Sequence, residues 1–328
     1  MKKHKKDANM RYKRFFILCC VFIASLLAPS SHACTTFCLD SNDALVVGRN
    51  FDWGTGDDLI NALIIVNKRN VSKTAGLDPA WIGEKPISWI SKYGNVTFNP
   101  LGREFPLSGM NEVGLVVSAM RLGKATKYPE PDSRPAITAP QWIQYQLDNY
   151  ATVGDVLASD LELRISNYDF WRPFHYFVCD STGTCATIEF IDEKLVYHTQ
   201  ETLPVKVLAN SIYSSDLEYW EKKERPKPES SPGRFYTAAL RLEDYDPGTS
   251  GSAIDYTFNI LSKLKWFIPN QWSIAYDILN RRINFYKDKN EDRRYVDLSS
   301  FDFLCSTPVK VLDISEDLSG DVSDNFID

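Results

Sequence analysis

The stretch CTTFCLDSNDALVVGRNFDW, residues 34–53, decides how this chain of 328 residues folds. It holds two runs with the composition of β-strands, Thr35–Leu39 and Ala44–Asn50. The segment Asp40–Asp43 between them consists of residues that favour turns. The stretch therefore predicts two short antiparallel strands, which would return its last residues to the side of its first cysteine.

Residues 1–33 precede this hairpin and have the layout of a secretory signal peptide. A basic head is followed by the apolar run Phe15–Leu27 and by a short stretch of small and polar residues. The apolar run is too short to serve as a membrane anchor. Ser31 and Ala33 offer the small side chains that a signal peptidase requires, so we expect cleavage before Cys34. The protein should then be exported, either periplasmic or secreted.

The charge of the mature chain excludes some partners. Residues 1–33 hold seven of the 37 basic and one of the 43 acidic residues, so 30 basic and 42 acidic residues remain, a net charge of −12. Binding to nucleic acid or to anionic membranes is driven by basic patches, so we expect neither partner. No later apolar run approaches the length of a membrane span, and we expect no membrane anchor.

The rest of the chain reads as one domain. It contains no long Pro/Gly/Ser-rich linker and no internal repeat, which favours a single domain over residues 34–313. The residues from Asp313 to Asp328 carry six acids and no base. We therefore expect an acidic tail over residues 314–328 that is frayed or solvated.

Five cysteines follow the predicted cleavage site. Cys179 and Cys185 flank a turn-like insert between two strand-like runs, which predicts a disulfide that closes a hairpin. A pairing of Cys38 with Cys305 is a looser expectation. These two pairs would leave Cys34 as the unpaired thiol.

The pattern of elements favours an α+β layered fold over a doubly wound parallel sheet, because strands follow one another in long runs and helices come in separate blocks. Further runs typical of strands are Leu59–Val66, Gly114–Met120, Phe174–Cys179, Cys185–Phe190, Lys194–His198, Val205–Ala209, Ser273–Leu279, Ile283–Tyr286 and Arg294–Leu298. Helical periodicity covers Pro140–Tyr150, Val153–Leu163 with Thr152 as N-cap, Arg234–Leu242 and Ala253–Leu264.

An N-terminal cysteine carries its own general base. If cleavage exposes Cys34, the α-amine has a typical reference pKa of about 8 and the thiol one of about 8.5. A modest shift of either pKa would make the amine neutral or the thiol ionised. An N-terminal nucleophile hydrolyses amides in this way, with its own α-amine as the base. A lipid-attachment site is disfavoured, because Ser31 and the bulky His32 occupy the positions where lipoprotein signals need a Leu-like and a small residue.

Other catalytic groups are scarce in the sequence. Only His175 and His198 remain after cleavage, and both lie in strand-like runs where a structural histidine is the better interpretation. No cluster has metal-ligand spacing, and no glycine-rich phosphate loop is visible, so we expect no metal and no cofactor.

Arg49 and Asp52 close the opening stretch. A guanidinium near the sulfur of Cys34 would favour the thiolate, and a carboxylate near the α-amine would orient it. Taken alone, however, an arginine and an aspartate after a strand indicate a salt bridge or a turn.

The motifs resemble those of the choloylglycine hydrolase family, which includes bile salt hydrolases and penicillin V acylases. The resemblance begins with CTTF at 34–37 and GRNFDW at 48–53. It continues in order with GMNEVGL at 109–115, QWIQYQLDNYAT at 141–152, LANS at 208–211 and SPGRF at 231–235. The segment SWISKYGNV at 88–96 is similar to the Gram-negative branch of the family.

The resemblance implies a four-layer αββα sandwich of the N-terminal nucleophile hydrolase type. It implies Cys34 as nucleophile and base, Arg49 as the cation that tunes the thiol, and Asp52 as the partner of the α-amine. Asn210 would lend its side-chain N–H to the oxyanion hole, and Arg234 would complete the polar network.

The second oxyanion donor of the family is a main-chain N–H, and the residue aligned with it is Arg121. Family members often carry Asn or Tyr there, so the pocket beside it is altered. A backbone donor survives a change of side chain, whereas the loss of a donor costs about 3–4 kcal/mol of barrier. We also expect Trp53 to contribute to an apolar acyl pocket.

The leading hypothesis is an amidase that cleaves a linear N-acyl amide through a thioester on Cys34. The acyl group could come from a bile salt, penicillin V or an acyl-homoserine lactone, and the enzyme could form a homo-oligomer. A dipeptidase of the related cysteine type, which also opens Cys-Thr-Thr, is one alternative. An inactive secreted binding protein on the same fold is the other.

Overall fold

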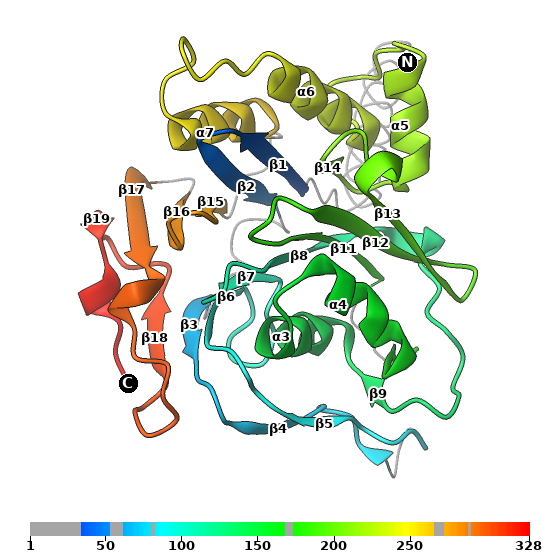
Figure 1. Cartoon of the computed structure of the whole chain (residues 1–328), viewed down its shortest axis with the longest axis vertical. Coiled ribbons are helices and arrows are strands. Elements are labelled where there is room, and N and C mark those ends of the chain that lie inside the picture. The colour runs from blue at the N-terminus through cyan, green and yellow to red at the C-terminus, as the bar shows by residue number, and fades with distance from the viewer. Residues whose placement is uncertain (1–33, 53–61, 80–82, 168–172, 266–271, 288–289) are drawn as a thin grey trace, which may run out of the picture. The chain divides into compact units, whose positions relative to one another are not determined.

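The computed structural model describes residues 34–52, 62–79, 83–167, 173–265, 272–287 and 290–328 (Figure 1). The predicted signal peptide, Trp53 and the first residues of the strand expected at Leu59–Val66 lie outside the described residues. No helix in the described part of the chain has the length and apolar character needed to cross a membrane.

The opening stretch forms the predicted hairpin and lies inside a seven-stranded sheet. β1 and β2 pair antiparallel, with Thr35 opposite Asn50 and Thr36 opposite Arg49. The order of strands across the sheet is β14-β1-β2-β15-β16-β17-β19. The strands are β1 (Thr35–Ser41), β2 (Ala44–Phe51), β14 (Val207–Leu208), β15 (Trp272–Asp277), β16 (Arg282–Lys287), β17 (Asn290–Asp297) and β19 (Gly320–Asp321).

A second sheet has eight strands in the order β13-β12-β11-β8-β7-β6-β3-β18. Its strands are β3 (Leu63–Asn67), β6 (Asn95–Asn99), β7 (Ser108–Asn111), β8 (Val116–Arg121), β11 (Phe174–Cys179), β12 (Cys185–Ile191), β13 (Lys194–Thr199) and β18 (Lys310–Asp313). Two small sheets complete the set and pair β4 (Ser72–Thr74) with β5 (Ser88–Ile90), and β9 (Ala136–Ile137) with β10 (Arg164–Ile165).

Helices cover the outer faces of both large sheets (Figure 1). On the seven-stranded sheet, α6 contacts β1 and β14, α7 contacts β2 and β15, and α5 packs on α6. On the eight-stranded sheet, α3 contacts β7 and β8. The helices are α3 (Ala139–Asn149), α4 (Val153–Ala158), α5 (Tyr213–Glu221), α6 (Ser231–Glu243) and α7 (Ala253–Lys263). The predicted αββα sandwich is confirmed.

Aromatic side chains fill the space between the two sheets. Phe98 of β6 makes edge-to-face contacts with Trp272 and Tyr276 of β15 and with Phe285 of β16, at ring-centroid distances of 5.8, 6.2 and 5.5 Å. The buried hydroxyl of Tyr276 donates to Ser108 Oγ of β7 at 2.7 Å. The sheets are therefore joined by dry packing and by a hydrogen bond that satisfies the buried polar group.

Local signals placed most of the other elements correctly. Thr152 caps α4 as predicted, and its hydroxyl accepts the N–H of Asp155 at 3.1 Å. This helix ends at Ala158, earlier than the predicted Leu163, and a 3₁₀ turn continues it. The residue patterns did not predict α5, β6, β7 or β18.

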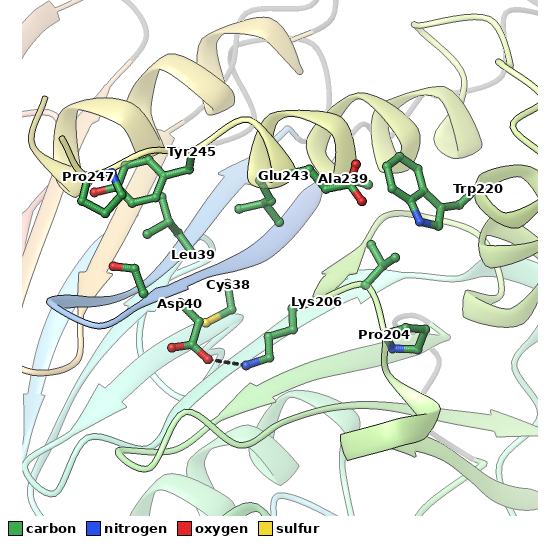
Figure 2. Close-up of a pocket in the computed structure, with 13 residues that line it drawn as sticks. Cys38, Leu39, Asp40, Pro204, Lys206, Trp220, Ala239, Glu243, Tyr245 and Pro247 are labelled. Atoms are coloured by element: carbon green, nitrogen blue, oxygen red, sulfur yellow. Dashed lines mark hydrogen bonds and ion pairs between the residues drawn. The ribbon is translucent and has the colours of Figure 1, made fainter. Parts of the chain in front are cut away.

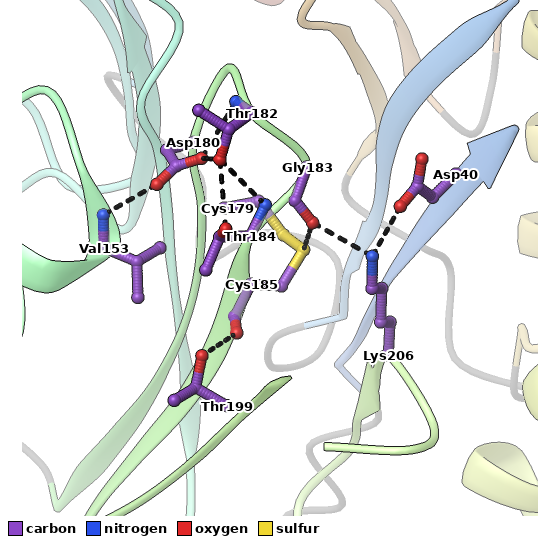
Figure 3. Close-up of a disulfide and its surroundings, with 10 residues drawn as sticks. All are labelled: Asp40, Val153, Cys179, Asp180, Thr182, Gly183, Thr184, Cys185, Thr199 and Lys206. Atoms are coloured by element: carbon purple, nitrogen blue, oxygen red, sulfur yellow. Dashed lines mark hydrogen bonds and ion pairs between the residues drawn. A yellow bond between two sulfur atoms is a disulfide. The ribbon is translucent and has the colours of Figure 1, made fainter. Parts of the chain in front are cut away.

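One of the two predicted disulfides is present. Cys179 and Cys185 are bonded and close the hairpin of β11 and β12 (Figure 3). The pairing of Cys38 with Cys305 is wrong, because Cys38 is a buried free thiol in β1 and Cys305 is an exposed free thiol. Cys34 is free, as expected.

The acidic tail is packed rather than frayed, so that expectation is wrong. β19 pairs in parallel with β17, and the backbones of Val311 and Ile327 exchange two hydrogen bonds of 2.8 and 2.9 Å. Val322 and Phe326 are buried, and the ring of Phe326 packs on Phe301 at 4.9 Å. The acids from residue 316 onward are exposed, whereas Ile314, Val322 and Phe326 are buried, so a prediction from the number of charges alone was wrong.

We predict that Phe326→Ala lowers the free energy of unfolding by about 3 kcal/mol, because it removes a buried ring and leaves a cavity. The neighbouring exposed residue gives the control, since Asn325→Ala should change stability by no more than about 0.5 kcal/mol. Urea unfolding of both variants measures the difference. Equal stability of the two variants would show that the tail does not contribute to the folded core.

Candidate active site

The hairpin of β1 and β2 builds one side of the site. Cys34 immediately precedes β1 and is 2 % exposed, and its thiol donates to the carbonyl oxygen of Asp52 at 3.6 Å. Asp52 immediately follows β2 and is also buried. The pairing of the two strands therefore brings the first and last residues of the hairpin together, as the sequence predicted.

Arg49 is a fully buried cation that reaches from one sheet to the other. From β2 its guanidinium donates to the carbonyl oxygen of Leu107 at 2.5 Å and to that of Ala119 in β8 at 2.7 Å. Within the described residues, its Nε has no hydrogen-bond partner and no carboxylate forms a salt bridge with it. Because an uncompensated buried charge is costly, this cation favours an anion nearby.

The electrostatics connect this cation to the thiol. Burial raises the pKa of Cys34, and Arg49 is the largest influence that opposes this rise. Asp52 raises the pKa of the thiol further, whereas Arg234 lowers it. In turn, burial lowers the pKa of Arg49, and Cys34 is the largest influence that raises it again. The two groups thus stabilise each other in their charged forms.

Asn210 and Arg234 form the opposite side. Asn210 follows β14 and is partly exposed, and its Oδ1 accepts a hydrogen bond from Arg234 Nη2 at 2.8 Å. Its Nδ2 donates to the main-chain carbonyl of Arg121 at 2.8 Å. These two bonds fix the amide plane and occupy one Nδ2 hydrogen, so the second Nδ2 hydrogen can serve an oxyanion.

Arg234 links this amide to the start of β1. It lies in the first turn of α6 and is 4 % exposed. Its Nε donates to Thr35 Oγ1 at 3.2 Å, directly beside Cys34. Sequence reasoning placed Arg234 in a polar network but missed Thr35, although this threonine stands inside the quoted CTTF motif.

Arg121 is the last residue of β8. Main-chain N–H groups two residues apart in a strand point to the same side. The N–H of Ala119 donates to Leu107 O, so the N–H of Arg121 points to that side of β8, where Arg49 also lies. This orientation is compatible with a main-chain donor in the site, whereas Trp53 lies outside the described residues.

His175 is structural, as predicted. It is fully buried, its Nε2 donates to the carbonyl of Ala209 at 2.9 Å, and its Nδ1 lies 3.1 Å from Glu189 Oε1. Both ring nitrogens are therefore engaged behind the site rather than in it.

A separate hollow of about 380 Å³ lies beside the turn of the opening hairpin (Figure 2). Trp220, Tyr245 and the ion pair of Asp40 with Lys206 line it, together with Cys38. None of the predicted catalytic residues contributes to it.

One group of three cysteines in the described part of the chain has the proximity of metal ligands. The sulfur atoms of Cys38, Cys179 and Cys185 lie within 4.8 Å of one another. Because Cys179 and Cys185 are joined in a disulfide, they offer no thiolate to a metal (Figure 3).

Solved structures with known activities share this fold. A penicillin V acylase from Agrobacterium tumefaciens superposes with a TM-score of 0.76 and 23% identity, covering 90% of this chain and 97% of its own. The R18L variant of a conjugated bile acid hydrolase from Clostridium perfringens gives a TM-score of 0.70 and 16% identity, covering 87% and 98%. These similarities confirm the N-terminal nucleophile hydrolase fold that the motifs implied.

Sequence comparison gives the family. The chain is 27% identical over 264 residues to a penicillin V acylase from Pectobacterium atrosepticum, which covers 73% of this chain and 67% of that protein. The profile of the linear amide C–N hydrolases, choloylglycine hydrolase family, matches residues 34–241, which is more than half of the chain. It begins at Cys34 and includes Arg49, Asn210 and Arg234. The chain therefore belongs to the choloylglycine hydrolase family of linear amide C–N hydrolases.

Proposed function

We propose that this chain is an exported amidase whose nucleophile is Cys34 after removal of residues 1–33. The observation that carries the proposal is the buried guanidinium of Arg49, which influences the thiol of Cys34 and has no carboxylate partner among the described residues. A structural salt bridge, the simpler interpretation of Arg49, needs such a partner. The position of Cys34 immediately before β1 fits a role for its freed α-amine.

The reaction follows from these groups. The thiolate of Cys34 attacks the carbonyl carbon of the amide, and the α-amine, having taken the thiol proton, returns it to the departing nitrogen. The C–N bond breaks and a thioester remains on Cys34. Water then attacks the thioester while the α-amine accepts its proton, which releases the carboxylic acid and restores the thiol.

The oxyanion that forms in both steps needs donors. Asn210 Nδ2, held by its bonds to Arg121 O and Arg234, supplies one, and the main-chain N–H of Arg121 supplies the other. We assign Asp52, which lies close to Cys34, to the freed α-amine as its partner. Trp53 follows directly in the sequence and is assigned to the acyl pocket.

The substrate is a linear N-acyl amide of the bile salt, penicillin V or acyl-homoserine lactone type. The relatives named penicillin V acylase and the shared fold of a conjugated bile acid hydrolase support the first two classes. A panel of glycocholate, penicillin V and an acyl-homoserine lactone distinguishes the three. Cleavage of dipeptides alone would favour the dipeptidase alternative instead.

We predict that the secreted protein begins at Cys34 and that Cys34→Ala is inactive on this panel. The variant should keep the stability of the wild type, because one small side chain at a chain terminus contributes little to folding. Intact-mass spectrometry gives the N-terminus, and thermal unfolding provides the control. A different start, a lipid on Cys34, or more than a tenth of wild-type activity in the variant would contradict the mechanism.

We predict that Arg49→Gln shifts the pH midpoint of iodoacetamide alkylation at Cys34 upward by about 1 to 3 pH units, because a nearby cation stabilises the thiolate. Glutamine keeps an N–H donor for the buried carbonyl groups while removing the charge. Arg282→Gln is the matched control, since this arginine pairs with Asp297 two strands away from β2. If both variants alkylate with the wild-type midpoint, Arg49 has no influence on the thiol.

Asn210→Ala should lower kcat by about 10²- to 10³-fold, the typical effect of removing one oxyanion donor. KM should change little, because the donor acts mainly in the transition state. Steady-state kinetics on the best substrate of the panel measure both constants. A rise in KM with an unchanged kcat would assign Asn210 to substrate binding instead.

A further inference from the structure

The segment that carries Asn210 is held from behind by buried polar groups. The carbonyl of Ala209 accepts from His175, and the N–H of Tyr213 donates to both oxygens of Glu189 at 3.2 and 3.3 Å. His175 and Glu189 are fully buried. The backbone is thus fixed on both sides of Asn210.

A chain of hydrogen bonds leads from Asn210 itself to a buried carboxyl group in α5. The main-chain N–H of Asn210 donates to Ser231 Oγ at 2.7 Å, and Ser231 Oγ lies 2.7 Å from Ser211 Oγ. Ser211 Oγ in turn donates to the two carboxylate oxygens of Asp216 at 2.7 and 2.8 Å. Asp216 is fully buried and lies in the first turn of α5.

The direction of this chain is set by its two ends. An amide N–H only donates, and an ionised carboxylate only accepts. The hydroxyl of Ser231 must therefore donate to Ser211, and that of Ser211 must donate to Asp216. All three bonds then run from Asn210 toward the carboxylate, an arrangement in which each bond polarises the next.

We propose that Asp216 is a positioning residue that orients Asn210 through the hydroxyls of Ser211 and Ser231, and that it does so only when its carboxyl group is ionised. This inference rests on the proposed function, because it treats Asn210 as the oxyanion donor. The side chain of Asp216 bonds to Ser211 and reaches Asn210 only through the two hydroxyls, so its effect is indirect.

The pKa of Asp216 lies near neutral pH. Burial raises the pKa of Asp216 to about 7, the hydrogen bond from Ser211 opposes the rise, Glu189 adds to it and Arg234 opposes it. Glu189 lies in β12 and Arg234 in α6, and the titratable ring of His175 in β11 lies beside Glu189. Below about pH 7 the carboxyl group therefore carries a proton.

Protonation can reverse the hydrogen-bond chain. A protonated Asp216 can donate to Ser211, whose hydroxyl then donates to Ser231. Ser231 Oγ would accept from both Ser211 and Asn210, and its own proton would lose its acceptor. Asp216 would also lose the charge that faces Arg234, which holds the side chain of Asn210. Both changes weaken the positioning of the same residue.

The test compares wild type with Asp216→Asn, which keeps the shape of the side chain but cannot ionise. We expect the kcat of the wild type divided by that of Asp216→Asn to rise from near one at pH 5 to about five at pH 8. A fivefold ratio is the effect of roughly one lost hydrogen bond. Titration of Cys34 and its α-amine is common to both proteins and cancels in the ratio. KM should change less than twofold.

A double-mutant cycle tests the path. Ser211→Ala removes the link and keeps Asp216, so it should lower kcat at pH 8 to a similar extent. In the Ser211→Ala background, Asp216→Asn should lower kcat by less than a further twofold, because Ser211 and Asp216 act as one unit. Asp180→Asn is the control, since this buried carboxylate bonds to Val153 and Thr182 rather than to Ser211 or Ser231. The kcat of the wild type divided by that of Asp180→Asn should not depend on pH.

A constant kcat ratio from pH 5 to pH 8, or additive effects in the cycle, would overturn the role of Asp216. If Asp216→Asn fails to fold, the same comparison is made with Ser211→Ala and Ser231→Ala, which leave the carboxyl group in place.

The proposal is also tested without turnover. In Cys34→Ala protein labelled with ¹⁵N-asparagine, the side-chain amide signal of Asn210 should titrate near pH 7. The signal is assigned by its loss in Asn210→Asp, and the titration should vanish in Asp216→Asn. An Asn210 signal that does not respond to pH would overturn the inference, whereas a wild type that is inactive on the panel would overturn only the proposed function.

Discussion

The rest of the site depends on the burial of the Arg49 guanidinium and on its hydrogen bonds. It is buried between two sheets and is held by two main-chain carbonyl oxygens, at Leu107 and Ala119. Carbonyl dipoles satisfy its hydrogens but supply no negative charge. Cys34 is the largest influence that opposes the lowering of the pKa of Arg49 by burial, and Arg49 is the largest influence that opposes the rise in the pKa of Cys34. The side chain that bonds to the second sheet is therefore also the one that most favours the charged form of the thiol.

The part of the site that carries Asn210 is also held by contacts from distant elements. Asn210 lies on a short segment after an edge strand, a location that ordinarily allows movement. Arg234, Arg121 O and Ser231 hold its side chain and its backbone. Because these partners come from α6 and β8, the proposed oxyanion donor is fixed only when α6 and the second sheet are assembled around it. Preorganised donors of this kind need no rearrangement as the reaction proceeds.

Several elements could not be predicted because polar residues stabilise them across long distances. β6 (NVTFN) and β7 (SGMN) are short, hold only three large apolar residues between them, and bury their polar residues as well. Asn95 is nevertheless fully buried, since its amide donates to Asp148 at 2.9 Å on α3, and Asp148 also accepts from Trp89 at 2.7 Å. A window of neighbouring residues contains no trace of these partners. The packed acidic tail was misjudged for a similar reason, because its partners Tyr295 and Phe301 belong to other elements.

The sequence by itself determined the opening hairpin, the α+β class, the disulfide between Cys179 and Cys185 and, through ordered motifs, the family. These features depend on neighbouring residues or on the order of motifs, and both are readable along the chain. Only the tertiary structure decided that Arg49 spans two sheets without a carboxylate partner among the described residues, and that Asn210 leads to the buried Asp216. Burial and charge in the site depend on residues far apart in the sequence, and their distances exist only after folding.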